Sequence, residues 1–218
     1  MTNTILQITK IDPDLLGEIK KSFNDLPETS HADGGYRLRK YSKVEAIWES
    51  HWLPSLDDLQ ITPLDISEFS QSEKYNKHQG GKARKFINIE PSVLFSSVMK
   101  EMMGIFLAPL DKSVKYEFDI HQIRVNCKGG ATQLSPEGWH QDGYDRVAMI
   151  GVDRNNIIGG EALLSTHKTE APFLQATLDA GTMLIIDDSY LWHNGRSIQP
   201  VDEAFSAWMD LLVFTLKK

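Results

Sequence analysis

From residue 114 onward, short apolar segments alternate with turn residues, and this feature constrains the fold most. The segments are rich in Val, Ile, Phe, Tyr and Trp, and the turns between them contain Gly, Asn or Asp. Such spacing is typical of antiparallel strands. It predicts six strands, near residues 116–127, 144–153, 160–166, 172–178, 181–187 and 207–216.

The first half of the chain carries helical signals instead. A first helix is predicted over residues 12–26, where Asp12 suits the N-cap and Pro13 the first turn. A second is predicted over 90–109, where apolar residues recur at helical spacing until Pro109. Several of these residues are Met, which fills irregular gaps between packed side chains, so we interpret this stripe as core.

Helices that precede a series of strands indicate an α+β fold. We expect a double-stranded β-helix, a jelly-roll or cupin-like barrel, with helices packed on its outer face. The length of 218 residues fits a single domain over 1–218, with a helical and mixed part over 1–113 and a β-rich barrel core over 114–218. Within the first part, only short strands near Tyr36 and Phe86 are predicted.

Charge and composition exclude several classes of partner. The formal net charge is -7 and no run of Lys or Arg occurs, which argues against nucleic acid as a partner. No stretch is apolar enough to predict a membrane span, and the first residues show no export signal. Cys127 is the single cysteine, so an intrachain disulfide is impossible and a reducing, cytoplasmic setting is expected.

Two His-x-Asp pairs are candidates for metal binding. His140 and Asp142 stand in "GWHQDGYDRVAMIGV", and if this segment is a strand, both side chains point to the same face. His31 and Asp33 form the other pair, in "ETSHADGGY". We interpret the second pair as a solvated loop, because it lies in polar, turn-like sequence before the predicted barrel.

His193 can complete a metal site with the first pair. It follows the predicted strand "GTMLIIDD", and the strands between could bring it back to His140 and Asp142. Two histidines and one carboxylate form the facial triad of non-haem Fe(II) oxygenases, which leaves open positions on the metal. The alternative from residues alone is that His193 is a buried, hydrogen-bonded histidine without a metal.

An ordered set of motifs adds a resemblance to a known family. The segments are "YNKHQGGKARKF", "HQIRV", "PEGWHQDG", "NIIGGEALL", "LIIDDSYLWH" and "DLLVFTL", which span roughly residues 36 to 216. This set resembles the bacterial 2-oxoglutarate–Fe(II) dioxygenases that include hydroxylases of free L-isoleucine and other aliphatic amino acids. The resemblance implies an enzyme that uses Fe(II), 2-oxoglutarate and O2, with His140, Asp142 and His193 as the iron ligands. Because Asp142 is present, the halogenating variant of this chemistry is disfavoured.

At the position where relatives carry an arginine that anchors 2-oxoglutarate, this chain departs from the family pattern. Relatives commonly have Arg-Asp before the last apolar strand, whereas this chain has Met209 before Asp210. A carboxylate prefers the two-pronged guanidinium, so another arginine is needed. We predict Arg196, where relatives commonly have threonine, with Arg124 as the second candidate and Ser197 as a further cofactor-binding residue.

Six further residues are predicted to contact substrate. Trp139, Tyr144 and Gln122 flank the motifs and could line a pocket, while the charged residues that could meet the carboxylate and ammonium of an amino acid are Arg37, Arg84 and Glu137. No catalytic residue beyond the metal ligands is expected, because in this chemistry the iron carries the oxidation.

The predicted function is therefore oxidation, most simply hydroxylation, of an unactivated C–H bond in a small molecule, a free amino acid or a close derivative. Desaturation and ring closure begin from the same step and stay open. Two alternatives remain: a non-catalytic jelly-roll protein that binds a ligand with a repurposed metal site, and an oxygenase that acts on a carrier-bound substrate.

Overall fold

A seven-stranded antiparallel sheet organises the chain in the computed structural model, which describes residues 4–50, 55–76, 80–127, 129–168 and 171–217. Three residues of "YNKHQGGKARKF", 77–79, lie outside the described residues. In spatial order the strands are β1 (Leu6–Lys10), β11 (Thr182–Asp187), β7 (Arg146–Asn155), β14 (Trp208–Leu216), β6 (Tyr116–Asn126), β2 (Arg37–Trp48) and β3 (Leu59–Leu64).

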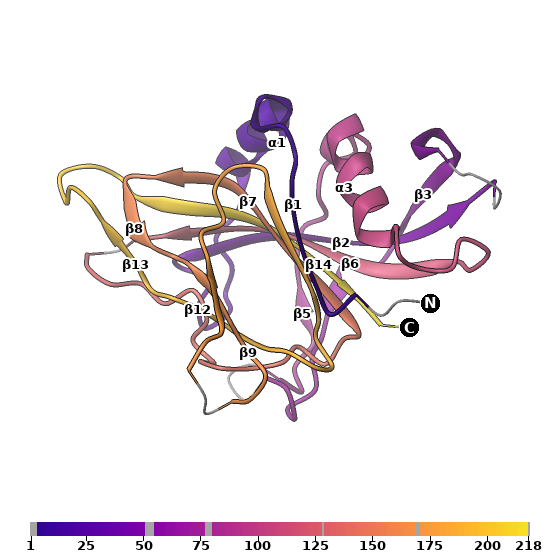
Figure 1. Cartoon of the computed structure of the whole chain (residues 1–218). Coiled ribbons are helices and arrows are strands. Elements are labelled where there is room, and N and C mark those ends of the chain that lie inside the picture. The colour runs from indigo at the N-terminus through magenta and orange to yellow at the C-terminus, as the bar shows by residue number, and fades with distance from the viewer. Residues whose placement is uncertain (1–3, 51–54, 77–79, 128, 169–170, 218) are drawn as a thin grey trace.

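Smaller sheets lie on the side of the large sheet that faces away from the helices (Figure 1). One has the order β10–β9–β12 and another pairs β13 with β8. Their bounds are Leu174–Ala176, Ala162–Ser165 and Trp192–Gly195 for the first, and Ile198–Pro200 and Ile157–Gly159 for the second. A third pairs β4 (Glu68–Phe69) with β5 (Arg84–Lys85). In the described ranges no ladder joins these sheets to the large one, so the expected closed barrel is not confirmed.

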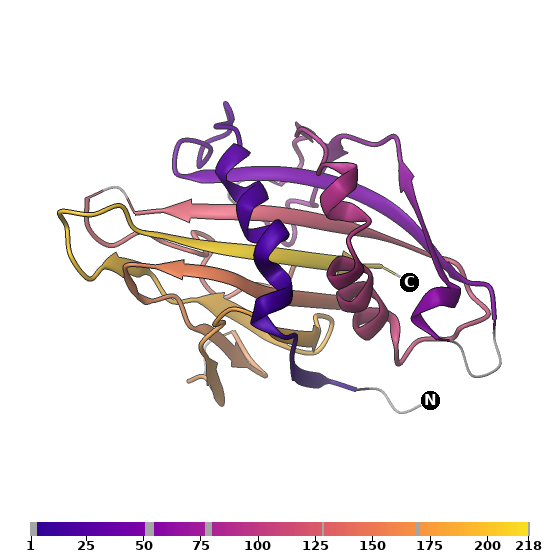
Figure 2. The ribbon, with the colours of Figure 1, turned by 90° about the horizontal axis from the view of Figure 1, so that it is seen from above.

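Helices cover the other face of the large sheet (Figure 2). The first predicted helix is a helical segment in three parts: η1 (Pro13–Leu16), α1 (Gly17–Ser22) and η2 (Phe23–Asp25). The carboxylate of Asp12 accepts a hydrogen bond from the backbone N–H of Asp14 at 3.0 Å, as expected of an N-cap. A further short helix, η3 (Leu56–Asp58), leads into β3.

The second predicted helix is divided in two. Its parts are α2 (Pro91–Leu94) and α3 (Ser97–Leu107), and the hydroxyl of Ser96 accepts from the backbone N–H of Met99 at 3.3 Å to begin α3. None of the helices in the described ranges combines the length and apolarity that a bilayer span requires.

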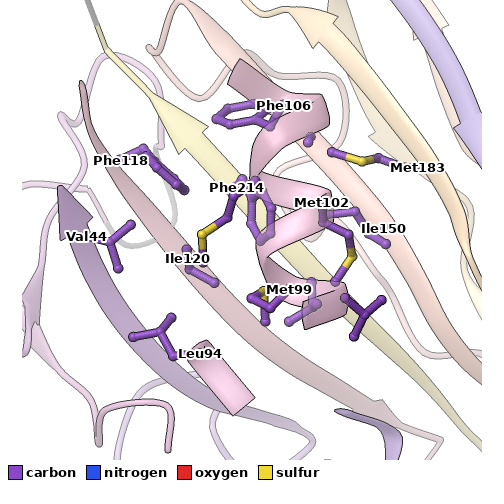
Figure 3. Packing of buried hydrophobic residues seen from close by; sticks show 14 of the residues in the cluster. Val44, Leu94, Met99, Met102, Phe106, Phe118, Ile120, Ile150, Met183 and Phe214 are labelled. Carbon is purple, nitrogen blue, oxygen red and sulfur yellow. The ribbon is translucent and has the colours of Figure 1, made fainter. Parts of the chain in front are cut away.

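The main core lies between α3 and the sheet (Figure 3). Met99, Met102 and Phe106 of α3 are fully buried and face Phe118 of β6 and Phe214 of β14. The ring centroids of Phe106 lie 5.6 Å from Phe118 and 5.7 Å from Phe214. The Met-rich stripe is therefore core, as predicted, and its burial holds the helix layer on the sheet.

The N-terminal part contributes more strand than its sequence predicts. The strands β1 and β3 were not expected, and β2 is twelve residues long where only a short strand near Tyr36 was predicted. In β2 the residues that alternate with apolar ones include Arg37 and Arg39, which are charged and yet partly or fully buried. Charged residues on a buried face conceal the strand pattern, because the pattern is read from hydrophobicity.

Candidate metal centre and cavity

Two histidines from distant segments meet through their backbones. The N–H of His140 donates to the carbonyl of His193 at 3.0 Å, and the N–H of His193 donates back at 2.9 Å. This isolated pair brings the two imidazole rings to a centroid separation of 4.2 Å. A segment that precedes β7 is thus fixed beside β12, which carries His193.

Asp142 lies in a loop rather than in a strand, and a buried carboxylate holds that loop. Asp188 is fully buried and accepts from the backbone N–H groups of Asp142, Gly143 and Tyr144 at 3.0, 2.9 and 3.1 Å. Its Oδ1 also lies 3.4 Å from Nδ1 of His193. Asp188 therefore holds the loop by hydrogen bonds and places its charge beside a ring of the site, where outer-shell partners of metal ligands lie.

The side chains of His140, Asp142 and His193 converge. Each offers one ligand atom, and these atoms all lie within 4.8 Å of one another. Nδ1 of His140 faces the carbonyl of Gly138 at 2.8 Å, which leaves Nε2 for a metal. Gln71 donates to Oδ1 of Asp142 at 2.9 Å. Two imidazoles and one oriented carboxylate fit an Fe(II) ion of the facial-triad type.

The electrostatics of the group favour cation binding. Burial alone would raise the pKa of Asp142, but the hydrogen bond and charge of His193, with a smaller effect of His140, hold it below its usual range. Burial and the neighbouring His193 lower the pKa of His140. Asp142 thus presents an ionised carboxylate and His140 a neutral imidazole, which are the forms that coordinate metals. Burial would lower the pKa of His193, but the hydrogen bond and charge of Asp142, with the charge of Asp188, raise it, so a metal at this site displaces a proton from His193.

A cavity opens beside the three side chains, between the large sheet and the smaller ones. Its apolar lining includes Ile123, Leu134, Ala162, Leu178 and Met209, which belong to one buried cluster. Its polar lining consists of Asp33, Arg37, Arg39, Gln71, Asn76, Arg84, His121 and Glu137, together with the metal-binding group and its neighbours. A chamber lined by both an apolar cluster and charged side chains can bind a small molecule that has both kinds of surface.

Three predicted substrate residues line this cavity, namely Arg37, Arg84 and Glu137. Three others do not. Gln122 is buried on the helix-covered face and donates to the hydroxyl of Ser22 at 2.6 Å. Tyr144 donates to Oδ2 of Asp119 at 3.0 Å and borders a second pocket, while Trp139 is absent from the described lining of the first.

The arginines predicted to anchor 2-oxoglutarate point away from the cavity. Arg196 has a half-exposed side chain that lies 3.4 Å from the carboxylate of Glu161 and donates to Gln175 at 3.0 Å. Arg124 donates twice to buried Asp210, both times at 2.7 Å, on the helix-covered face. The prediction of Arg196 or Arg124 as the anchor is therefore not supported, because their guanidinium groups already have partners elsewhere.

The structure also places two further residues for which the sequence made predictions, Ser197 and Asp33. Ser197 does not line the cavity among the described residues. Asp33, expected in a solvated loop, is only 7% exposed, and its Oδ2 lies 3.8 Å from Nη1 of Arg37. The interpretation of that loop as solvated was wrong for Asp33, because the loop folds over the end of β2 and turns the carboxylate towards the cavity.

Several cavity residues were missed by the sequence reading. They include Gln71, Asn76 and the buried pair Arg39 and His121. A signal for Arg39 did exist, since it stands two residues after Arg37 and a strand places both on one face. No comparable signal exists for Gln71, which reaches Asp142 from a loop 71 residues away.

A family model described as "2OG-Fe dioxygenase" matches residues 20–215, which is most of the chain. The chain belongs to the 2OG-Fe dioxygenase family. It is accordingly an enzyme that uses Fe(II), 2-oxoglutarate and O2, and the resemblance seen in the sequence is confirmed. This assignment removes the alternative of a non-catalytic ligand-binding protein.

Known proteins are similar to this 2OG-Fe dioxygenase in sequence or in fold. The L-isoleucine-4-hydroxylase of Bacillus thuringiensis is 22% identical over 178 residues, covering 78% of this chain and 70% of that protein. A BsmA homologue from Methylobium petroleophilum superposes with a TM-score of 0.78 at 24% identity, covering 99% of this chain and 89% of the other. IDO from Bacillus thuringiensis gives a TM-score of 0.73 at 18% identity, covering 96% and 89%.

Proposed function

We propose that this dioxygenase hydroxylates an unactivated C–H bond of a small molecule, a free amino acid or a close derivative. The observation that supports this proposal is a cavity in which a His-Asp-His group adjoins a wall bearing both guanidinium and carboxylate groups. An amino acid carries the complementary carboxylate and ammonium groups. Charge complementarity of this kind fixes the orientation of a ligand.

In this proposal, His140, Asp142 and His193 hold Fe(II). The oxidation itself is supplied by the bound iron together with 2-oxoglutarate and O2, and it yields succinate, CO2 and the hydroxylated product. The chain's own residues bind, orient and exclude water. Asp188 keeps the loop of Asp142 in place, and Gln71 orients its carboxylate.

The polar wall is proposed to select the substrate. Arg37 and Arg84 would meet a carboxylate, while Glu137, which accepts from Asn76 at 3.3 Å, would meet an ammonium group. The apolar side chains of the lining, among them Ile123 and Leu178, would contact hydrocarbon. This division suits an amino acid with an aliphatic side chain.

We also propose that residues 1–218 form one dioxygenase domain and that the two sheet layers represent an open form of the double-stranded β-helix. Strands from both halves of the chain join one sheet, since β2 pairs with β6 over ten residue pairs from Arg37 to Ala46. Limited proteolysis should therefore release no stable fragment at the boundary near residue 114.

The experiment is a screen for succinate formation with Fe(II) and 2-oxoglutarate across the free amino acids. The name of the Bacillus thuringiensis relative makes L-isoleucine the first to test. Stimulated succinate formation with a hydroxylated amino acid product is the expected result. Turnover only with a carrier-tethered substrate or only with nucleic acid would overturn the proposal.

A further inference from the structure

Arg39 is a buried cation for which the described part of the chain provides no ion-pair partner. It is only 8% exposed, and it lines the cavity from near the start of β2. Among the described residues it has no ion pair or hydrogen bond through its guanidinium, whose Cζ lies over the ring of Phe86, 5.3 Å from the ring centroid. A face-on aromatic contact compensates a buried charge only partly.

Neighbouring positive charges increase the free-energy cost of burying the guanidinium of Arg39. Arg37 projects from the same face of β2, and Arg84 enters from β5, so three guanidinium groups share one wall. Burial, with further contributions from Arg37 and Arg84, lowers the pKa of Arg39 to about 9. The carboxylates of Asp33 and Glu137 act in the opposite direction but do not cancel this effect.

A buried, unpaired charge is costly unless a binding partner compensates it. An arginine that lines a cavity can be compensated by an anion that enters the cavity. A guanidinium fits a carboxylate through two parallel hydrogen bonds. The position and isolation of Arg39 thus point to a ligand carboxylate.

We propose that Arg39 binds a carboxylate group of a ligand in the cavity and is a specificity-determining residue of this enzyme. The inference rests on the proposed function, in which two carboxylate-bearing molecules share the cavity: 2-oxoglutarate, through its distal carboxylate, and the amino acid. The chemistry of recognition is the same for both.

Arg154 and Arg196, which do not line the cavity in the described ranges, are poorer candidates because their guanidinium groups already have partners in the protein. Arg154 lies beside Met209, but it donates to the carbonyl of Gly159 at 2.6 Å and lies 3.6 Å from the carboxylate of Asp179. It does not line the cavity in the described part of the chain. Arg196 is paired with Glu161 on the outside.

The test compares Arg39→Gln and Arg39→Lys with Arg196→Gln, which makes the same change of charge at a half-exposed position. Isothermal titration calorimetry on Fe(II)-loaded protein without oxygen measures the Kd of 2-oxoglutarate, and then the Kd of L-isoleucine, or of an amino acid found in the screen, at saturating 2-oxoglutarate. Arg39→Gln should weaken one of the two by about thirtyfold or more. Arg39→Lys should recover part of the loss, and Arg196→Gln should change neither.

The arm that responds identifies the source of the carboxylate. Weaker 2-oxoglutarate binding assigns Arg39 to the distal carboxylate, and weaker amino acid binding alone assigns it to the substrate. Unchanged affinity for both in Arg39→Gln overturns the inference. If the amino acid screen fails, the substrate part of the proposed function fails, while the 2-oxoglutarate arm still decides the role of Arg39.

Thermal unfolding of the ligand-free proteins separates binding from a structural role. Because Arg39 has no ion-pair or hydrogen-bond partner among the described residues, Arg39→Gln should leave the melting temperature of the ligand-free protein unchanged or raise it. A structural arginine would instead lower that temperature without a selective effect on either Kd. That second pattern would also overturn the inference.

Discussion

On one face of the seven-stranded sheet, helices cover aromatic and aliphatic side chains; on the other, the same strands present charged and polar groups to a cavity. The strand β14 shows both environments, since Phe214 is in the main core and Val213 and Thr215 line the cavity. In β6, Phe118 packs under α3, while His121 lines the cavity.

The two faces of the sheet thus divide the residues that stabilise the fold from the residues that line the ligand cavity. Successive side chains of a strand point to opposite faces, so neighbours in sequence have unrelated roles. On the helix-covered face, a buried charge is compensated within the protein, since Arg124 donates two hydrogen bonds to Asp210. The cavity face retains Arg39 without a partner in the described ranges, so its compensation must come from a ligand.

The largest expected effect is on the cavity side. His193→Ala should abolish both succinate formation and stoichiometric iron binding, because it removes one of three ligand groups. The protein should still fold, since the backbone pair with His140 remains. Iron content and succinate are measured together, with His31→Ala as the control that keeps both. Full activity in His193→Ala would show that the metal lies elsewhere.

The second-largest effect is expected in the core beneath α3. Phe214→Ala should lower the free energy of unfolding by about 3–5 kcal/mol, since it leaves a cavity among fully buried aromatic residues. Val213→Ala, on the cavity side of the same strand, should cost clearly less. Urea unfolding followed by circular dichroism measures both variants. Equal losses would mean that the two faces contribute alike to stability.

A smaller loss is expected at the buried ion pair. Arg124→Met should lower the free energy of unfolding by about 2–3 kcal/mol, because the Asp210 carboxylate is left buried without its donor. The affinity for 2-oxoglutarate should not change, since Arg124 lies on the helix-covered face. Calorimetric titration with 2-oxoglutarate provides the check, and a large rise in Kd without loss of stability would contradict this placement.

The smallest effect is expected at the surface. Arg196→Thr should change the free energy of unfolding by no more than about 0.5 kcal/mol, because its contacts with Glu161 and Gln175 are half exposed. The KM for 2-oxoglutarate should stay the same in succinate assays. An increase of tenfold would restore Arg196 as the anchor and would require its side chain to turn into the cavity.

The sequence by itself predicted the elements whose signals are local. Strands near 116–127, 181–187 and 207–216 match β6, β11 and β14 closely, because each is an apolar run bounded by turn residues. The order of the motifs also predicted the family. The convergence of His140, Asp142 and His193 follows from that resemblance, and the spacing of the residues alone left a buried histidine as an alternative.

Only the tertiary structure decided which arginine faces the cavity. The alternation of side chains along β6 assigns Arg124 to one of the two faces of the strand. It does not indicate which of these faces the helices cover. That choice depends on where α1 and α3 pack, which is a long-range property. The spacing of Arg37 and Arg39 indicates that they share a face of the strand, but it does not indicate that Arg39 is buried. A charged residue is predicted to be exposed unless the shape of a cavity and the ligand it binds are known.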